Sequence, residues 1–324
     1  MQDRVVWFNG EFVPEREARL SIYDSSLMFG DMVFEMTRSF GGRQFKLREH
    51  LERLMAGVKM LRVPLTLTID ELERAVLDTV ERNAGAMLAD DEHRVMIDVS
   101  RGLLGIYRGR VDAPAGPNVI IADFPLRWTV AGMAELYERG VNGIIPSQRA
   151  IPAELLDPKV KNRSRVHYLM ANIQVGNHTG ADNRAILLDP DGFVAESTGD
   201  NVLVVRKGRI ISPEGRNILR GISRAFVMEE LAPRLGIPVD ERNLTPYDVH
   251  TACEAFLVAT PYCILPMVSL DGVPIGDGRP GPVYRRLLAA WGEEVGIDIA
   301  GQIRAWDAAP APGGGDGPTA YRFR

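Results

Sequence analysis

Apolar residues recur along the chain at two different spacings, which predict a mixture of helices and strands. A helix over about residues 48–61 is expected from one apolar face, formed by Leu51, Leu54, Met55, Val58 and Leu61. A second helix begins after Thr68, where the sequence TIDE has the spacing of a capping box. Further helices are expected over about 164–176, 222–235 and 283–291.

Short apolar runs between turn residues predict the strands. The first two strands lie within residues 5–12 and turn at Asn9-Gly10, a strong hairpin signal. Similar runs predict strands or hairpins over residues 94–100, 118–124, 143–146, 185–188, 193–195, 201–205, 209–211 and 254–260. Residues 101–117 are rich in Gly, Arg and Pro and predict a long loop, a length that is more often functional than idle.

The order of these elements indicates two α/β (α+β) lobes. We expect an N-terminal lobe over residues 1–125, an interdomain loop over 126–133 and a C-terminal lobe over 134–307. Residues 308–324 are rich in Gly, Pro and Ala and predict a disordered tail.

Composition removes several classes of partner. The formal charge of −5 gives no basic surplus for a nucleic-acid backbone. Two cysteines, Cys253 and Cys263, are too few for a disulfide framework or a zinc ribbon. The N-terminus does not have the pattern of a signal peptide, and no apolar run has the length of a membrane span, so a cytoplasmic protein is expected.

The common catalytic motifs are absent from the sequence. It contains no GxxxxGK[ST], GxSxG or HExxH, and no GxGxxG between a strand and a helix. The five histidines show no metal-ligand spacing, so we expect surface or hydrogen-bonded histidines and no metal site. Kinases of the P-loop type, serine hydrolases, zinc enzymes and Rossmann dehydrogenases are therefore disfavoured.

Four weaker features remain, each with an ordinary structural explanation of its own. Lys161 stands in a basic run, one of only five lysines, and Glu196 ends a predicted strand. The segment Leu219–Ser223 places small residues at a helix N-terminus, where free N–H groups suit a phosphate. Thr260 closes an apolar strand.

The order of these features resembles that of the class IV aminotransferases, the fold-type IV pyridoxal-phosphate enzymes. The matching segments are MFGDMVFEMTR (28–38), LREHLERL (47–54), KNRS (161–164), FVAESTGDNVLVV (193–205), LRGISR (219–224), FLVAT (256–260) and VSLDGVPIGDGRPGPV (268–283). The resemblance covers the chain from Trp7 to about Trp291 and implies the two-domain fold of that family.

The resemblance also implies the cofactor, pyridoxal 5′-phosphate, and the residues that hold it. A lysine amine forms a Schiff base with the cofactor aldehyde, and the family motif places that lysine at Lys161, with Lys159 as a nearby rival. Glu196 matches the carboxylate that faces the pyridine nitrogen, and Arg53 matches the phosphate arginine. The other matching cofactor-binding positions are Leu219 on the ring face and Ile222, Ser223 and Thr260 near the phosphate.

One position departs from the family pattern. Branched-chain enzymes often carry a tyrosine five residues after the lysine to bond the cofactor phenolic oxygen, and here that residue is Val166. Arg165 and Tyr168 are both candidates for the missing role.

Substrate specificity is less clearly marked. FGDMVFE is similar to a segment of D-amino acid aminotransferases, whereas Arg38 falls where branched-chain enzymes carry an arginine. The alternating residues Phe29, Met32, Phe34 and Met36 suggest an apolar substrate mouth, although core packing also explains them. Our candidate substrate-binding residues are Phe34 and Arg38, with Arg101, Tyr107 and Arg108 in the loop where relatives bind the substrate carboxylate.

The resemblance implies an enzyme that moves an amino group between a hydrophobic, branched-chain amino acid and 2-oxoglutarate. Alternatives are a D-amino acid or (R)-amine transaminase, a lyase of the aminodeoxychorismate type, and a scaffold without cofactor. The expected partners are a small amino acid or amine, a 2-oxo acid and a second copy of the chain in a homodimer.

Overall fold

The computed structural model describes residues 3–309 and divides them between two compact units. The first unit contains residues up to Leu126 together with Val160–Arg165, and the second contains Arg127–Lys159 and the residues from Val166 onward. The boundary after Leu126 lies beside the one expected from sequence. Residues 126–133 are not a plain loop, because α4 (Arg127–Val130) buries two side chains there.

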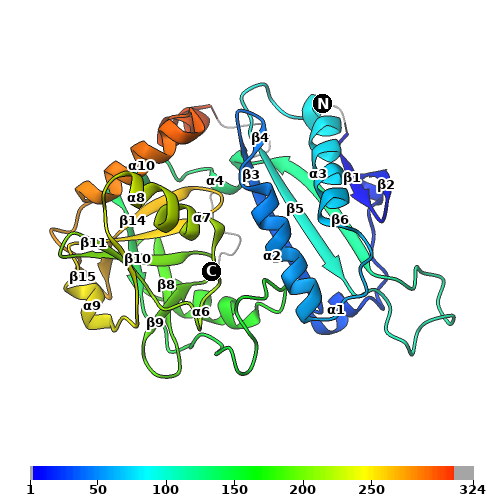
Figure 1. Cartoon of the computed structure of the whole chain (residues 1–324), viewed down its shortest axis with the longest axis horizontal. Coiled ribbons are helices and arrows are strands. Elements are labelled where there is room, and N and C mark those ends of the chain that lie inside the picture. The colour runs from blue at the N-terminus through cyan, green and yellow to red at the C-terminus, as the bar shows by residue number, and fades with distance from the viewer. Residues whose placement is uncertain (1–2, 310–324) are drawn as a thin grey trace. The chain divides into compact units, whose positions relative to one another are not determined.

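The first unit is built on an antiparallel sheet with the strand order β2-β1-β6-β5-β3-β4. Helices α2 and α3 cover one face of it (Figure 1). Its elements are β1 (Val5–Phe8), β2 (Glu11–Pro14), η1 (Glu15–Glu17), α1 (Ser25–Phe29), β3 (Met32–Phe40), β4 (Arg43–Gln44), α2 (Leu47–Met60), α3 (Ile69–Asn83), η2 (Ala84–Ala86), β5 (His93–Ser100) and β6 (Asn118–Pro125).

Local sequence explains several of these elements directly. The hairpin between β1 and β2 turns at Asn9 and Gly10, both with positive φ, as a tight two-residue turn requires. The capping box expected at Thr68 is present, with Glu71 bonded back to the cap. The apolar face of α2 packs onto β3 and β5 in one core that includes Leu51, Leu54 and Val58.

Strand β3 was not expected from the sequence, although Met32, Phe34 and Met36 alternate along it, because the positions between them are buried as well. Its two faces differ in chemistry: Val33 and Glu35 point to α2, whereas Phe34 and Met36 point to the other side. One edge of β3 pairs with β5 along most of its length, whereas β4 pairs with the other edge only at Ser39 and Phe40.

The segment Val160–Arg165 completes the outer edge of β3. The backbone N–H of Phe34 donates to the Lys161 carbonyl at 2.9 Å, and Arg163 N–H donates to the Met32 carbonyl at 3.0 Å. These bonds, with a bridge between Val33 and Asn162, explain why Lys161 belongs to the first unit. The expected C-terminal lobe bearing the lysine is therefore revised: the lysine segment pairs with an N-terminal strand.

The second unit is built on a larger sheet with the path β12-β11-β10-β13-β14-β7-β8-β9. An additional pairing of β9 with β10 joins Glu196 to Asn201 and closes part of this path into a ring. Its strands are β7 (Val141–Ile144), β8 (Asn183–Leu188), β9 (Val194–Ser197), β10 (Asn201–Arg206), β11 (Arg209–Ser212), β12 (Val239–Glu241), β13 (Glu254–Ala259), β14 (Cys263–Leu270) and β15 (Val273–Pro274).

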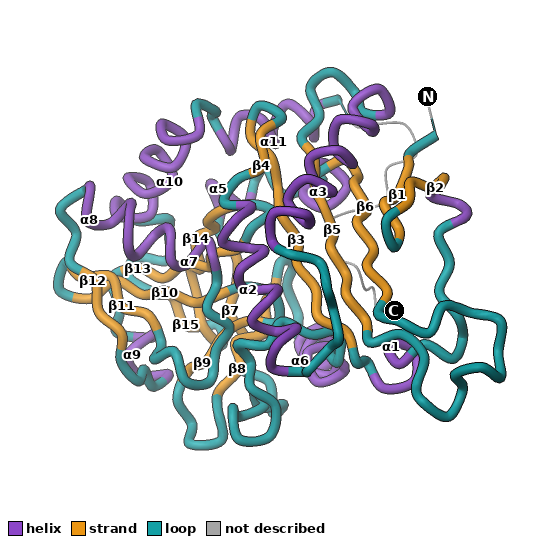
Figure 2. The backbone as a smooth tube through the Cα atoms, turned by 45° about the vertical axis from the view of Figure 1, so that its right-hand side comes forward, coloured by secondary structure: helices purple, strands orange, loops and turns teal. Residues whose placement is uncertain are grey.

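The second unit also contains helices, several of which pack against these strands, whereas the last contacts the first (Figure 2). They are α4, α5 (Leu136–Arg139), α6 (Val166–Gly176), α7 (Ile222–Ala225), the π-helical turn η3 (Phe226–Leu231), α8 (Ala232–Arg234), α9 (Pro246–His250), α10 (Pro282–Val295) and α11 (Ile299–Ala308). The helix expected over 222–235 is thus α7, η3 and α8 in succession. Strand β14 and helix α11 were not expected from sequence.

Residues 308 and 309 of the expected tail are described, and residue 308 ends α11. The rest of that tail prediction lies outside the described residues. Within residues 3–309, no helix combines the length and the apolar character that a bilayer crossing needs.

Candidate active site

The first unit holds Lys161 against an aromatic ring. Its Nζ lies 4.9 Å from the centroid of the Phe34 ring, and the guanidinium carbons of Arg163 and Arg165 lie 3.8 and 5.6 Å from the same centroid. Phe34 is 4% exposed, so the ring is a fixed surface rather than a mobile cover. An electron-rich ring face attracts cations, and it therefore favours this position for the lysine ammonium.

Arg163 is anchored by an acid on β5. Its Nε and Nη2 lie 2.9 and 2.8 Å from Oδ1 of Asp98. Burial raises the pKa of Asp98, and the Arg163 charge opposes that rise. The strip that carries Lys161 is thus fastened to β3 by its backbone and to β5 by a side chain.

Arg53 is oriented by a fully buried carboxylate. Glu35 on β3 accepts from Arg53 Nε at 2.6 Å and from Arg53 Nη2 at 2.8 Å. His50, one turn earlier on α2, lies with Nδ1 2.7 Å from the other side of this carboxylate. Two parallel N–H bonds to one carboxylate fix the plane of the guanidinium as well as its position.

The charge states of Glu35 and His50 follow from their burial and from the charged groups beside them. Burial alone would raise the pKa of Glu35, but Arg53 and His50 outweigh it and hold the pKa well below its usual range. Burial lowers the pKa of His50 although Glu35 opposes the change. At neutral pH the histidine is therefore uncharged, its Nδ1–H donates to Glu35, and Arg53 is the charged partner.

Sequence reasoning missed Glu35 and gave His50 no specific role. A signal was present, because His50 and Arg53 are spaced to share one face of the predicted helix and LREHLERL was one of the matching segments. The sequence did not show which acid on another element they would meet.

The second unit holds Glu196 in a set of three donors. Tyr168 Oη donates to Oε1 at 2.7 Å, while Leu219 N–H and Asn201 Nδ2 donate to Oε2 at 2.9 and 3.2 Å. Asn201 Nδ2 also lies 2.9 Å from the Leu219 carbonyl. Glu196 is 5% exposed, so these bonds determine the orientation of its carboxylate.

Gly221 explains how this network closes. A Cβ on Gly221 would overlap Oδ1 of Asn201, so only glycine leaves room for the amide beside Glu196. Gly221 is also the N-cap of α7, which begins at Ile222 and buries Ser223. Thr260 directly follows β13, the strand that pairs with β10.

The structure separates the two residues considered for the missing tyrosine role. Arg165 lies over Phe34 in the first unit, and the hydroxyl of Tyr168 donates to Glu196 in the second. Lys159, the rival of Lys161, pairs with Asp157 at 2.8 Å and donates to the Arg216 carbonyl at 3.3 Å.

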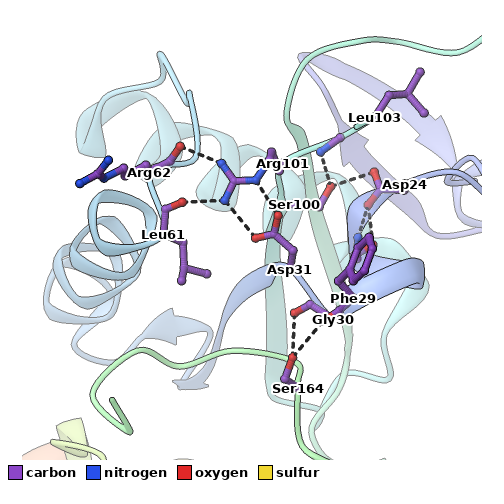
Figure 3. A network of polar contacts seen from close by, with 12 residues as sticks. Asp24, Phe29, Gly30, Asp31, Leu61, Arg62, Ser100, Arg101, Leu103 and Ser164 are labelled. Atoms are coloured by element: carbon purple, nitrogen blue, oxygen red, sulfur yellow. Dashed lines mark hydrogen bonds and ion pairs between the residues drawn. The ribbon is translucent and has the colours of Figure 1, made fainter. Parts of the chain in front are cut away.

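Arg101 holds a turn of the first unit together. Its guanidinium donates to both oxygens of Asp31, at 2.6 and 3.2 Å, and to the carbonyls of Leu61 and Arg62 at 2.6 and 2.9 Å (Figure 3). Those carbonyls follow the last turn of α2, where unpaired C=O groups need donors. In the structure Arg101 therefore links the start of β3 to the end of α2, and its contact with a substrate carboxylate stays a prediction.

The other loop candidates are less constrained. Tyr107 stacks against Tyr23 with ring centroids 4.8 Å apart, and Arg108 donates to the Leu103 carbonyl at 3.3 Å. Both remain predictions as substrate residues. Among the apolar mouth residues, Met32 and Phe34 are buried, whereas Phe29 is 66% exposed.

Ser164, three residues after the lysine, fastens the strip to α1. Its hydroxyl donates toward the Phe29 and Gly30 carbonyls at 3.3 and 3.2 Å (Figure 3). Gly30 has a φ of +67°, and a Cβ there would overlap the Ser164 hydroxyl. Glycine is therefore required at the turn on which the lysine strip rests.

Comparison with known proteins identifies the family. The model of amino-transferase class IV matches residues 32–270. A protein of Methanocaldococcus jannaschii, provisionally named a branched-chain-amino-acid aminotransferase, is 35% identical over 283 residues, which are 87% of this chain and 93% of that protein.

Two solved structures support the same conclusion. The Escherichia coli branched-chain amino acid aminotransferase has a TM-score of 0.78 at 30% identity, covering 90% of this chain and 94% of that one. The T.th. branched-chain amino acid aminotransferase complexed with N-(5′-phosphopyridoxyl)-L-glutamate has a TM-score of 0.78 at 27% identity, covering 95% and 98%. This chain belongs to the class IV aminotransferases and has their fold-type IV architecture.

Proposed function

We propose that the chain transfers an amino group between a hydrophobic, branched-chain L-amino acid and 2-oxoglutarate. The chain is a pyridoxal-phosphate-dependent aminotransferase, similar over nearly its whole length to branched-chain enzymes. The two substrates are our inference from that similarity. The observation that carries the proposal is the lysine strip, which presents Lys161 on the Phe34 ring beside β3.

The residues present fit the cofactor. Pyridoxal phosphate offers an aldehyde, a phosphate and a pyridine nitrogen, and it withdraws electrons from the substrate carbon when it is bound. The chain offers an amine at Lys161, a guanidinium with a fixed plane at Arg53 and a fixed carboxylate at Glu196. Leu219, Ile222, Ser223 and Thr260 remain proposed further contacts.

Each side chain then has a defined task. Lys161 would hold the cofactor at its aldehyde, and its amine would carry a proton to and from the substrate carbon. Glu196 would face the pyridine nitrogen and favour its protonated form, as a carboxylate of fixed orientation can. Arg53 binds the phosphate through the guanidinium edge that Glu35 does not occupy.

Substitution of Lys161 tests this assignment directly. Holoenzyme with Lys161 intact should absorb near ~410–430 nm, as expected for the lysine-bound cofactor. Lys161→Ala should lose that band and all turnover, whereas Lys159→Ala should keep both. Loss of the band in Lys159→Ala but not in Lys161→Ala would transfer the role to Lys159.

The substrate class is tested on the same band. L-leucine should bleach it, and 2-oxoglutarate should restore it. Bleaching by D-alanine or by an (R)-amine, with no response to L-leucine, would replace the branched-chain proposal with one of its alternatives.

We also propose that the enzyme is a homodimer, as the family resemblance implies. Apolar side chains at and just before α1 support a second copy as partner, because Ile22, Leu27 and Phe29 are 73%, 64% and 66% exposed. Light scattering should give twice the mass of the chain, and Leu27→Glu should shift the mass toward that of one chain. A monomeric mass without substitution would refute the proposal.

A further inference from the structure

Helix α6 contacts the end of strand β9 at two points. The Tyr168 hydroxyl donates to Oε1 of Glu196 at 2.7 Å. One turn later on α6, Oδ1 of Asn172 accepts from the Thr198 hydroxyl at 3.0 Å. Because Tyr168 and Asn172 are four residues apart, their side chains share one face of the helix. This face therefore contacts the Glu196 carboxylate itself and, separately, the loop that follows it.

The two oxygens of the Glu196 carboxylate have different partners. Oε2 accepts two N–H groups, from Leu219 and Asn201, and two is the number of bonds that a carboxylate oxygen readily accepts. Oε1 accepts the Tyr168 hydroxyl. The pyridine nitrogen that Glu196 is proposed to face is therefore expected at Oε1, the oxygen that Tyr168 holds.

The hydrogen bond from Tyr168 has two physical effects on this carboxylate. Glu196 is 5% exposed, and burial without donors disfavours the ionised form of a carboxyl group. A hydroxyl at 2.7 Å stabilises the ionised form, and it also limits rotation of the carboxylate about its last side-chain bond. Both effects favour an ionised oxygen at a fixed position, which is the acceptor that a protonated pyridine nitrogen needs.

The same hydroxyl cannot fully serve a second acceptor. Tyr168 and Arg165 are the candidates from sequence for bonding the phenolic oxygen of the cofactor, because Val166 stands where relatives often carry a tyrosine. A tyrosine hydroxyl has a single hydrogen, and here that hydrogen is donated to Glu196. A buried carboxylate competes well for it, because hydrogen bonds to ionised acceptors are stronger than those to neutral ones.

We propose that Tyr168 is a positioning residue that acts on the cofactor through Glu196, by keeping Oε1 ionised and correctly placed for the pyridine nitrogen. The proposal rests on the proposed function and deepens it, because it names the side chain on which the pairing of Glu196 with the ring nitrogen depends. The chain should consequently bind the cofactor more tightly than an analogue without that nitrogen, and the difference should depend on Tyr168.

Cofactor analogues test this role without turnover. The full chain, freed of cofactor, is titrated by fluorescence with pyridoxal phosphate and with its carbocyclic analogue, in which C–H replaces the ring nitrogen. Tyr168→Phe should weaken binding of pyridoxal phosphate by roughly 10-fold, as loss of one hydrogen bond to a charged group implies, and binding of the analogue by less than about 3-fold. Thr198→Val, which removes the other contact of α6 with this segment, should keep the unsubstituted ratio of the two affinities.

A double substitution shows whether Tyr168 acts through the carboxylate. Glu196→Gln should remove the preference for the ring nitrogen, and adding Tyr168→Phe to it should not change the ratio further. Equal weakening of both compounds by Tyr168→Phe would show a merely structural role and refute the proposal. A third compound, the analogue without the phenolic oxygen, gives another refuting result if Tyr168→Phe leaves its binding alone and weakens the other two.

Failure of the proposed function would be seen separately. An unsubstituted chain that binds pyridoxal phosphate with no preference for the ring nitrogen would overturn the role of Glu196, and that of Tyr168 with it. A chain without the lysine-bound absorbance band would overturn the aminotransferase assignment of Lys161 itself.

Discussion

Replacement of Glu35 by glutamine should disrupt the site that orients Arg53. The carboxylate accepts three charge-assisted or buried hydrogen bonds, two from Arg53 and one from His50. Glutamine has nearly the same shape but carries an amide in place of one oxygen. That amide would face N–H donors, and the Arg53 charge would lose its partner.

The size of the effect follows from burial. Hydrogen bonds to charged groups contribute about 1.5–3 kcal/mol each, which would sum to roughly 5–9 kcal/mol for three. The bonds act as a unit, and the Arg53 side chain is 12% exposed and can turn partly toward water. We therefore expect a loss of about 3–5 kcal/mol, the usual cost of removing one partner of a buried pair.

Two measurements on the full chain test this prediction: unfolding by denaturant and titration with pyridoxal phosphate. Glu35→Gln should lower both the free energy of unfolding and the affinity for the cofactor. The control is Glu92→Gln, since Glu92 is another buried carboxylate of this unit with hydroxyl and backbone donors. It should lose stability but keep its cofactor affinity. The reasoning would be refuted if the free energy of unfolding of Glu35→Gln lay within about 1 kcal/mol of that of the unsubstituted chain. Equal losses of cofactor affinity in Glu35→Gln and Glu92→Gln would also refute it.

Three further outcomes are expected. Arg101→Met should lower the free energy of unfolding by about 1–2 kcal/mol, because it loses two hydrogen bonds to Asp31 and two to carbonyls at the end of α2. Arg110→Met, at an exposed loop position, should change the free energy of unfolding by less than about 0.5 kcal/mol, and equal effects of the two substitutions would contradict this role of Arg101. Gly221→Ala should weaken cofactor binding, because the added Cβ would displace the Asn201 amide from the Glu196 carboxylate. Gly199→Ala should leave cofactor binding unchanged, because a Cβ there meets open space. Fluorescence titration with the cofactor would show whether the two variants differ. The free energy of unfolding should fall as the pH drops through about 4, because the pKa of Glu35 is lower in the folded chain than in the unfolded chain. The unfolded chain therefore binds this proton at a higher pH than the folded chain does. The slope of unfolding free energy against pH should be shallower in Glu35→Gln, which lacks this group.

Local patterns in the sequence were sufficient for most of the secondary structure. The Asn9-Gly10 turn, the capping box at Thr68 and the apolar face of α2 each act over a few residues, so their outcome can be predicted without knowing the fold. Buried strands such as β3 and β14 were missed because burial on both faces removes the alternation that marks a strand.

The family motifs in the sequence also indicated the main site residues. Lys161, Glu196 and Arg53 stand in the family order along the chain, and that order is a property of the sequence alone. Their partners could not be predicted in the same way. Glu35 meets Arg53 because β3 packs on α2, and Asn201 meets Glu196 because β9 pairs with β10.

Only the tertiary structure decided which arginine side chains have hydrogen-bond acceptors within the protein. Arg101 looked like a substrate residue in sequence, but it is satisfied by Asp31 and by the end of α2. Arg94 carried no signal, yet strand register places it opposite Arg38 with buried donors that have no acceptor within the described residues. Whether a charge is structural or functional depends on which groups surround it, and those groups are brought together only by the fold.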